Sequence, residues 1–325
     1  LPIYAAVYGA RASYIGGAAG TATVLAGQMF GIPVSGTMAH SWVMYYKDEY
    51  EAFRHYAENY PDNTVLLVDT YDTIKSGIPN AIRVAREVLE PMGKRLKGIR
   101  IDSGDLAYQS IKVRKMLDDA GLTDCKIIVS NSLDEHTISS LNMQKARIDG
   151  YGVGERLITG ASSDYSEDSI SLLGAVYKIA AVEENGGFAP RIKVSGSVEK
   201  ITNPGLKKVY RVYDQNGKAK ADLIAKADET IDMSQEFRFV DPDMPWRNLK
   251  FTHCTVRPLQ EKIFENGKLV YKLPTLNEIR AYVKKQLDEE IWEEEQRFVN
   301  PHKHYMDMTP DYYDMKMSLL NDSRA

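Results

Sequence analysis

Short apolar runs alternate with longer segments of helical period between residues 65 and 155. Successive runs end about 20 to 35 residues apart, which is the length of one strand and one returning helix. A strand followed by such a crossover lies parallel to the next strand, with a right-handed connection. The alternation therefore predicts an α/β fold with a parallel sheet. The four predicted strands are Val65–Asp69, Gly98–Asp102, Lys126–Ser130 and Ile148–Gly154.

Each predicted strand ends in a polar or glycine-rich signature. Proteins of the α/β class bind ligands at the carboxyl ends of parallel strands, where these signatures would meet. Aspartate, serine and asparagine are also favoured helix N-caps directly after a strand, so a cap alone explains any single signature equally well. Four signatures together favour a shared site. They are Asp69-Thr70-Tyr71-Asp72, Asp102-Ser103-Gly104-Asp105, Ser130-Asn131-Ser132 and Gly152-Val153-Gly154-Glu155.

The pattern differs ahead of the repeat and after it. Ahead of it we expect helices at Gly16–Gly31 and Ser41–Tyr60, with a short strand at Pro33–Gly36. From Leu172 to about Val270 the pattern is typical of strands, and a charged amphipathic helix capped by Thr275 follows to about Val299. In the strand-rich part, strands are predicted at Arg191–Val194 and Lys208–Tyr213, with a turn at Asp214–Gly217.

These segments predict three parts of the chain. An α/β core at residues 1–185 would carry the active site, a β-rich part at 186–272 would close it, and a C-terminal helical part would occupy 273–325.

Composition narrows the function classes. The chain is 43% hydrophobic and 26% charged, as is usual for a globular protein with a sizeable core. Its net charge of −4 gives no overall reason to bind nucleic acid or an anionic membrane. Cys125 and Cys254 show no zinc or disulfide spacing, which favours a reducing cytoplasm. No apolar run approaches the roughly 18 residues of a membrane helix.

His40 lies in Gly36-Thr37-Met38-Ala39-His40-Ser41-Trp42, a segment that opens a predicted helix. The positive end of a helix dipole disfavours the imidazolium ion and leaves a neutral, nucleophilic ring nitrogen. A histidine at a helix start is nevertheless more often a packing or hydrogen-bonding residue. The motif alone leaves both interpretations open.

Arg100 and Asp102 are predicted to point to one face of their strand, because side chains alternate with a period of two. A buried ion pair at the strand end is one interpretation. The other is a site in which Arg100 takes a carboxylate or phosphate and Asp102 faces a developing positive charge. Gly152 and Gly154 would let backbone N–H groups approach a phosphate, although two glycines also make a common tight turn.

Together these motifs resemble the nicotinate phosphoribosyltransferase family in its bacterial form. The resemblance covers nearly the whole chain. It implies an irregular α/β barrel of phosphoribosyltransferase type II, joined to a second domain. It also implies condensation of nicotinate with phosphoribosyl pyrophosphate (PRPP), coupled to ATP hydrolysis and dependent on Mg²⁺. The motifs are Tyr8-Gly9-Ala10-Arg11, Gly20-Thr21, Gly31-Ile32-Pro33-Val34, Gly36 to Ser41, Asp69 to Asp72, Arg100 to Asp105, Ser130-Asn131, Gly152 to Gly154 and Asn300-Pro301-His302.

The resemblance also implies roles for individual residues. His40 matches the histidine that ATP phosphorylates transiently, and Arg100 would hold the nicotinate carboxylate. Asp102 would face the reacting ribose and ring nitrogen, while Asp69 would reach Mg²⁺ or pyrophosphate through water. The further positions expected to bind substrates are Tyr8, Arg11, Thr21, Ala22, Ser130, Asn131, Gly152, Gly154, Glu155 and Lys193.

Ala22 bears on the choice of substrate, since nicotinamide-using relatives carry an aspartate at that place. An aspartate there would repel a nicotinate anion, so alanine favours the acid. A nicotinamide or quinolinate phosphoribosyltransferase is the alternative enzyme. Family members also carry a substantial N-terminal region ahead of the segment that starts here, so we expect either a fragment of the enzyme or a non-catalytic remnant. A homodimer is the family expectation.

Overall fold

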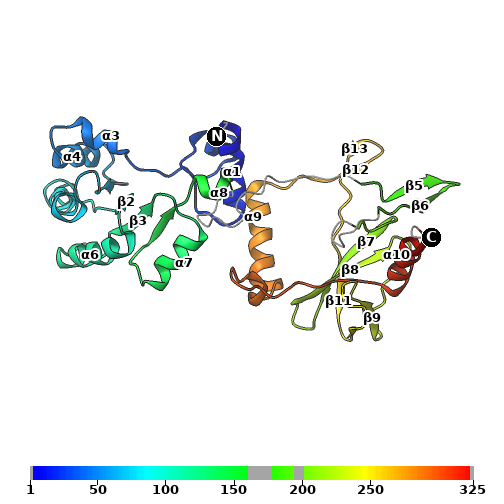
Figure 1. Ribbon diagram of the computed structural model, residues 1–325. Coiled ribbons are helices and arrows are strands. Elements are labelled where there is room, and N and C mark those ends of the chain that lie inside the picture. The colour runs from blue at the N-terminus through cyan, green and yellow to red at the C-terminus, as the bar shows by residue number, and fades with distance from the viewer. Residues whose placement is uncertain (1–2, 160–177, 194–200, 323–325) are drawn as a thin grey trace. The chain divides into compact units, whose positions relative to one another are not determined.

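The computed structural model describes residues 3–159, 178–193 and 201–322, which form two compact units (Figure 1). The first unit contains the described residues 3–14 and 18–159. The second contains 15–17, 178–193 and 201–322. Each unit has its own sheet and its own buried core.

A four-stranded parallel sheet in the order β1-β2-β3-β4 organises the first unit. Neighbouring strands pair with Leu67 opposite Arg100, Arg100 opposite Ile128 and Ser130 opposite Gly152. The alternating βα pattern of the sequence is thus confirmed. The strands are β1 (Val65–Leu67), β2 (Gly98–Ile101), β3 (Lys126–Ser130) and β4 (Gly150–Gly152).

Helices connect these strands as expected. A continuous helical run from Thr73 to Met92 joins β1 to β2, and its middle is the α-helix α5 (Ile78–Val84). The next crossovers are α6 (Leu106–Asp119) and α7 (Glu135–Met143), while the short α8 (Glu155–Thr159) follows β4. The remaining parts of the run are η1 (Thr73–Gly77), η2 (Ala85–Leu89) and η3 (Glu90–Met92).

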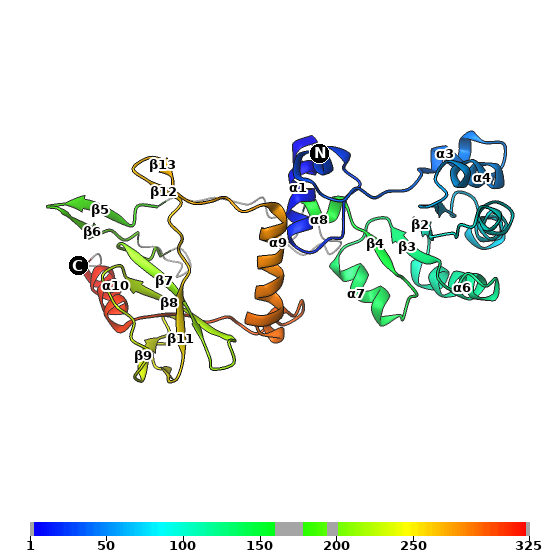
Figure 2. The ribbon, with the colours of Figure 1, turned by 180° about the vertical axis from the view of Figure 1, so that it is seen from behind.

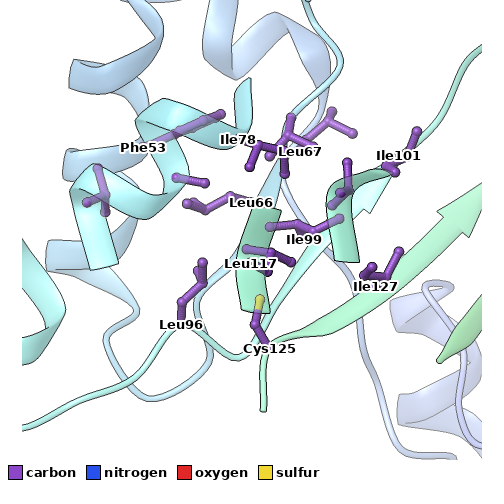
Figure 3. Packing of buried hydrophobic residues seen from close by; sticks show 14 of the residues in the cluster. Phe53, Leu66, Leu67, Ile78, Leu96, Ile99, Ile101, Leu117, Cys125 and Ile127 are labelled. Atoms are coloured by element: carbon purple, nitrogen blue, oxygen red, sulfur yellow. The ribbon is translucent and has the colours of Figure 1, made fainter. Parts of the chain in front are cut away.

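The core of the first unit lies between the sheet and these helices (Figure 3). Leu66, Ile99 and Ile127 of three adjacent strands are completely buried. Phe53 of α4 (Glu49–Asn59) and Leu117 of α6 are buried in the same cluster. Burying a large apolar side chain contributes about 1.5–3 kcal/mol, so this cluster holds the strands in fixed register.

Two of the predicted helices ahead of the sheet have other bounds. Instead of one helix at Gly16–Gly31, the chain forms α1 (Ile3–Ile15) and α2 (Val24–Phe30). Thr21 between them pairs with Val34 in an isolated parallel bridge, which is all that forms of the strand predicted at Pro33–Gly36. Thr21 is extended because its backbone N–H and C=O bond to the 33–35 segment.

The helix predicted at Ser41–Tyr60 is divided into α3 (His40–Tyr45) and α4. Tyr46 has extended backbone angles that end α3. Asp48 then caps α4 by accepting a hydrogen bond from the backbone N–H of Glu51. An N-cap aspartate needs non-helical angles, so the second helix cannot continue the first.

The second unit is built on a six-stranded sheet in the order β10-β9-β14-β8-β7-β11, seen from two sides in Figures 1 and 2. Its central hairpin confirms the predicted strand and the turn at Asp214–Gly217. Leu223 and Phe239 are buried on one face of the sheet, and Tyr312 is buried with Ile224 on the other side of the strand. The strands are β7 (Lys207–Tyr213), β8 (Ala219–Lys226), β9 (Phe237–Val240), β10 (Asn248–Phe251), β11 (Thr255–Pro258) and β14 (Met306–Met308).

Smaller elements complete the second unit. The helix capped by Thr275 is confirmed at its start, but α9 (Leu276–Lys285) and η5 (Gln286–Glu290) end before the predicted Val299. The strand predicted at Arg191–Val194 is displaced to β6 (Gly187–Pro190), and Val194 lies outside the described residues. The others are β5 (Ala181–Glu184), β12 (Phe264–Glu265), β13 (Lys268–Leu269), η6 (Glu293–Gln296) and α10 (Pro310–Asp322). Within the described residues, no helix is long and apolar enough to cross a membrane.

Candidate active site

The carboxyl ends of β1, β2 and β3 bring polar side chains together at one edge of the parallel sheet. Asp69 follows β1, Asp102 follows β2, and Ser130 is the last residue of β3. The backbone N–H of Asp102 donates to Oδ2 of Asp69 over 2.8 Å, and the Ser130 hydroxyl donates to Oδ1 of Asp102. These contacts confirm that the strand-end signatures converge.

Arg100 is held in place by three acceptors. Its Nε donates to Ser130 Oγ over 2.8 Å, one terminal nitrogen donates to Thr37 Oγ1 over 2.8 Å, and the other donates to Asp102 Oδ1 over 3.0 Å. The predicted shared face of Arg100 and Asp102 is therefore confirmed, with Ile99 and Ile101 buried on the opposite face. A guanidinium has five N–H donors, so three are used here and two remain for a ligand.

Asp102 presents one anchored oxygen and one available oxygen. Oδ1 accepts hydrogen bonds from Ser130 and Arg100, while no described residue donates to Oδ2. Partial burial raises the pKa of Asp102, but the hydrogen bonds from Ser130 and Arg100 outweigh it and hold the pKa below its usual value. The group is thus an ionised carboxylate with a free oxygen beside the Arg100 cation.

His40 is the first residue of α3, as the sequence predicted, and its ring faces Asp69. The distance from Nε2 to Asp69 Oδ1 is 3.2 Å. The other carboxylate oxygen accepts from the Ser103 hydroxyl over 2.6 Å as well as from the backbone of Asp102. Asp69 is almost completely buried, with 2% of its side chain exposed, whereas 37% of the His40 side chain is exposed. The imidazole is therefore oriented by a buried carboxylate and open on its remaining side.

Helix capping after the strands is carried out by Asp72 and Asp105 of the same signatures and by Asp134, two positions after the third signature. Asp72 accepts from the backbone N–H groups of Ile74 and Lys75, at the start of the helical run after β1. Asp105 and Asp134 cap α6 and α7 in the same way. Capping is thus confirmed for Asp72 and Asp105, while the shared ligand site stays a prediction for the residues that cap no helix. Asp69, Asp102 and Ser130 face the site, and the later aspartates begin the helices.

An exposed aromatic wall lies on α1 and α2. The ring centroids of Tyr8 and Phe30 are 5.6 Å apart, and the Arg11 guanidinium carbon lies 5.7 Å from the Phe30 centroid. A Cβ atom at Gly9 would lie 2.8 Å from Cγ2 of Ile158. Glycine is therefore needed for α1 to pack on α8, the helix that follows β4. A flat ring and a cation on neighbouring positions suit a planar anionic ligand.

Six further predicted positions lie in the first unit. Gly152 stands opposite Ser130, where a Cβ atom would lie only 3.2 Å from the serine Cβ. Asn131 is exposed and has a left-handed backbone with φ of 90°. Thr21 forms the bridge to Val34. Ala22, Gly154 and Glu155 are exposed.

Lys193 is the one predicted position in the second unit. It lines an open hollow of about 410 Å³ there.

Three residues of the first unit were missed by the sequence-based assignment. Thr37 accepts from Arg100, Ser103 donates to Asp69, and Phe30 packs between Tyr8 and Arg11. Thr37 and Ser103 stand in the quoted motifs, so their membership of the same motifs as His40 and Asp102 was the available signal. Phe30 offers no such signal, because its contact with α1 arises only from the fold.

Two family models match the sequence. The model of the nicotinate phosphoribosyltransferase (NAPRTase) family matches residues 11–232. The chain belongs to the nicotinate phosphoribosyltransferase family. A model of the nicotinate phosphoribosyltransferase C-terminal domain matches residues 206–316 in addition. The resemblance inferred from the motifs is therefore confirmed.

Individual relatives agree with this family assignment. The chain is 47% identical to a nicotinate phosphoribosyltransferase of Bacillus subtilis over 99% of its length, and spans 64% of that protein. It matches the crystal structure of human nicotinic acid phosphoribosyltransferase with a TM-score of 0.74 and 26% identity, covering 97% of this chain and 67% of the human one.

A nicotinate-nucleotide pyrophosphorylase of Pyrococcus furiosus matches with a TM-score of 0.60 and 26% identity, covering 89% of this chain and 63% of that one. These likenesses confirm the predicted type II phosphoribosyltransferase fold.

Proposed function

We propose that this chain carries the catalytic core that condenses nicotinate with PRPP, giving nicotinate mononucleotide and pyrophosphate, coupled to ATP hydrolysis through a phosphohistidine at His40. The observation that carries the proposal is the hydrogen-bonded group formed by His40, Asp69, Asp102 and Arg100 at the sheet edge. This edge is where phosphoribosyl-transfer and phosphoryl-transfer steps would meet.

The phosphoryl step uses His40 as nucleophile. Asp69 Oδ1 accepts the N–H of Nε2, which leaves the lone pair on Nδ1. Nδ1 attacks the γ-phosphorus of ATP, the bond from that phosphorus to the bridging oxygen breaks, and ADP leaves with the electron pair. Asp69 stabilises the ring in this tautomer, since its carboxylate accepts only. Water then removes the phosphate from the histidine later in the cycle.

The transfer step uses Arg100 and Asp102. The two remaining N–H donors of Arg100 would hold the nicotinate carboxylate, and the Tyr8 ring would form a wall for the pyridine. As the bond from ribose C1 to pyrophosphate breaks, positive charge develops on the sugar, and the free Oδ2 of Asp102 would stabilise it. The pyridine nitrogen then forms the new bond to C1, and pyrophosphate leaves with the electrons of the broken bond.

Phosphate recognition is assigned to the turn after β4. The backbone N–H groups of Gly152 and Gly154 would bind the 5′-phosphate, and Ser130 with Asn131 would contact the ribose hydroxyls. Glu155 would contribute through its backbone N–H, because its exposed carboxylate repels phosphate. Arg11 is the proposed further cation of the first unit, with Thr21 and Ala22 close to the pyridine, and a substrate contact of Lys193 stays a prediction from the sequence alone.

Among the described residues, no group of three His, Cys, Asp or Glu side chains is placed to coordinate a metal ion such as Mg²⁺. Both oxygens of Asp69 accept hydrogen bonds from protein donors, so we propose that this carboxylate reaches Mg²⁺ through a water molecule rather than directly. We therefore assign Mg²⁺ to the phosphates of PRPP and ATP, and derive no step from a protein-bound ion.

The test combines labelling with product formation. Folded protein incubated with γ-labelled ATP is expected to carry an acid-labile label that His40→Ala removes. Nicotinate, nicotinamide and quinolinate are then compared as substrates with PRPP, and nicotinate is expected to be consumed fastest. Absence of label in folded protein would overturn the phosphohistidine, and faster use of another acid or amide would overturn the substrate.

Assembly and location follow from the proposed reaction. We propose a homodimer, since a substrate wall as exposed as Tyr8 would be completed by a second subunit. Sedimentation equilibrium tests this, with a monomer as the contradicting result. ATP and PRPP are cytoplasmic metabolites, so the cytoplasm is the proposed compartment.

A further inference from the structure

The second unit contains a cavity of about 510 Å³ that the proposed reaction does not use. Its walls come from β8, the end of β10 and the segment between η5 and β14. Part of that segment is His302 of the Asn300-Pro301-His302 motif, to which no role in the reaction has been assigned. Pockets for small molecules span about 300–1,000 Å³, so the volume admits a ligand with several rings. The lining residues are Lys220, Lys250, Phe251, Trp292, Glu294, Glu295, His302 and Tyr305.

Aromatic side chains in this cavity are held in fixed positions. The Trp292 indole N–H donates to the backbone oxygen of Ala219 over 2.7 Å. The Arg247 guanidinium lies 4.9 Å from the Tyr305 ring centroid and donates a hydrogen bond to the Tyr305 hydroxyl. The His302 ring packs edge to face against Tyr305, with the two ring centroids 5.9 Å apart. Phe251, another lining residue, is almost completely buried. Fixed flat faces of this kind stack with a planar heteroaromatic ring.

The charges in the cavity are mostly neutralised within the protein. Glu295 accepts from Nδ1 of His304 over 3.0 Å, Glu294 pairs with Arg297, and Lys250 pairs with Glu236 over 2.6 Å. Lys220 is different, because it forms no ion pair with any residue that the structure describes. Its Nζ lies 5.9 Å from the Phe251 centroid, beside the aromatic walls. An ammonium group in that position favours an anionic substituent on the ligand.

We propose that this cavity is a nucleotide-binding site, in which a base stacks on the Trp292 and Tyr305 rings and a phosphate binds Lys220. A single pyridine ring would leave much of the volume empty, whereas a mononucleotide carries both the flat ring and the anion. The site lies wholly within the second unit and stands independently of the reaction proposed for the first. It is therefore suited to regulation by nucleotide supply.

The test uses AMP as probe and 5-fluorotryptophan as reporter. The chain contains three tryptophans, so fluorine NMR resolves Trp292 separately from Trp42 of the first unit and from Trp246. AMP is expected to shift the Trp292 signal in a saturable manner and to leave the Trp42 signal in place. Lys220→Gln is expected to weaken binding by about tenfold or more, and Lys220→Arg to retain it. Lys268→Gln, on exposed β13, is the matched control and should bind as the parent does.

Three results would overturn the proposal. The first is a Trp292 signal that does not respond to AMP in protein whose three fluorine signals show it to be folded. The second is equal binding of inorganic phosphate alone, which would indicate a simple anion site. The third is equal binding of adenosine and AMP by the parent, because Lys220 would then have no role. Nicotinate mononucleotide formation should be unchanged in Lys220→Gln, whatever the ligand.

Discussion

Nε2 of His40 lies 3.2 Å from Oδ1 of Asp69, although 29 positions separate the two residues in the sequence. The same carboxylate accepts from the backbone of Asp102 and from the Ser103 hydroxyl. The orientation of the imidazole is thereby tied to the end of β2, where Arg100 and Asp102 stand. A substitution at Asp69 should therefore alter the orientation and tautomer of the His40 ring.

Asp69→Asn is expected to lower phosphohistidine formation by about tenfold or more, since an amide can present an N–H to the ring and favour the wrong tautomer. Quantitative labelling with γ-labelled ATP measures the effect. Asp72→Asn is the matched control, because asparagine caps a helix as well as aspartate does. Equal labelling of folded Asp69→Asn and parent protein would contradict the orienting role.

Asp102→Asn is expected to separate the two steps. Labelling of His40 should persist, while nicotinate mononucleotide formation falls by about a hundredfold or more, because the negative charge at the ribose is lost. The pKa of Asp102 is held low, so its ionised form stabilises the fold at neutral pH and this contribution is lost as pH falls through the folded value. The stability difference between Asp102→Asn and parent should accordingly shrink on acidification. A parallel loss of labelling and transfer would argue against separate roles.

Asp307 on β14 gives a stability prediction of opposite sign. Both carboxylate oxygens are buried without a hydrogen-bond partner among the described residues. Burial, and next the Asp241 carboxylate, raise the pKa of Asp307 to about 6. A raised folded pKa means that stability is complete below the usual carboxyl value and is lost as pH rises through 6.

Asp307→Asn should therefore increase the free energy of unfolding at pH 8 by about 1–3 kcal/mol and give no gain below about pH 4. Urea unfolding of both proteins across this range measures it. Asp243→Asn, which removes a surface pair with Lys303, is the control and should leave stability nearly unchanged at every pH. A gain that does not depend on pH would indicate another cause.

Gly77→Ala should destabilise the first unit by about 1–3 kcal/mol, because the new Cβ would lie 1.8 Å from the backbone oxygen of Val68. Thermal or urea unfolding measures the loss. Gly36→Ala is the matched control, since nothing lies within 4 Å of its Cβ position and its backbone φ is not left-handed. Similar stability of the two variants would show that the helical run after β1 moves away from the strand without cost.

The sequence pattern predicted the parallel sheet and the convergence of the strand-end residues of the candidate site, but not the contact between His40 and Asp69. Period-two alternation placed Arg100 beside Asp102, and the strand-end pattern predicted that Asp69 and Ser130 would join them. The dipole argument for His40 did not include Asp69, because no local pattern relates residues 29 positions apart.

The predicted ends of helices were wrong where tertiary contacts override the helical period of the sequence. Thr21 is extended by its pairing with the 33–35 segment. The helix after Thr275 ends at Glu290, and two residues later the Trp292 indole binds the backbone of β8. The break before Asp48 had a visible signal, an aspartate followed by Glu51 three positions later, but the aromatic run on both sides obscured it.

Helix capping and the proposed ligand contact involve different residues at the sheet edge. Asp72, Asp105 and Asp134 start the helices, and Asp69, Asp102 and Ser130 face the candidate site. Substitutions at the second set leave the helix starts untouched. The chemistry of the sheet edge can therefore change by substitution there while the framework stays intact. Evolvability in this fold thus has a local origin, in the interval of three or four positions from each site residue to the helix cap that follows it.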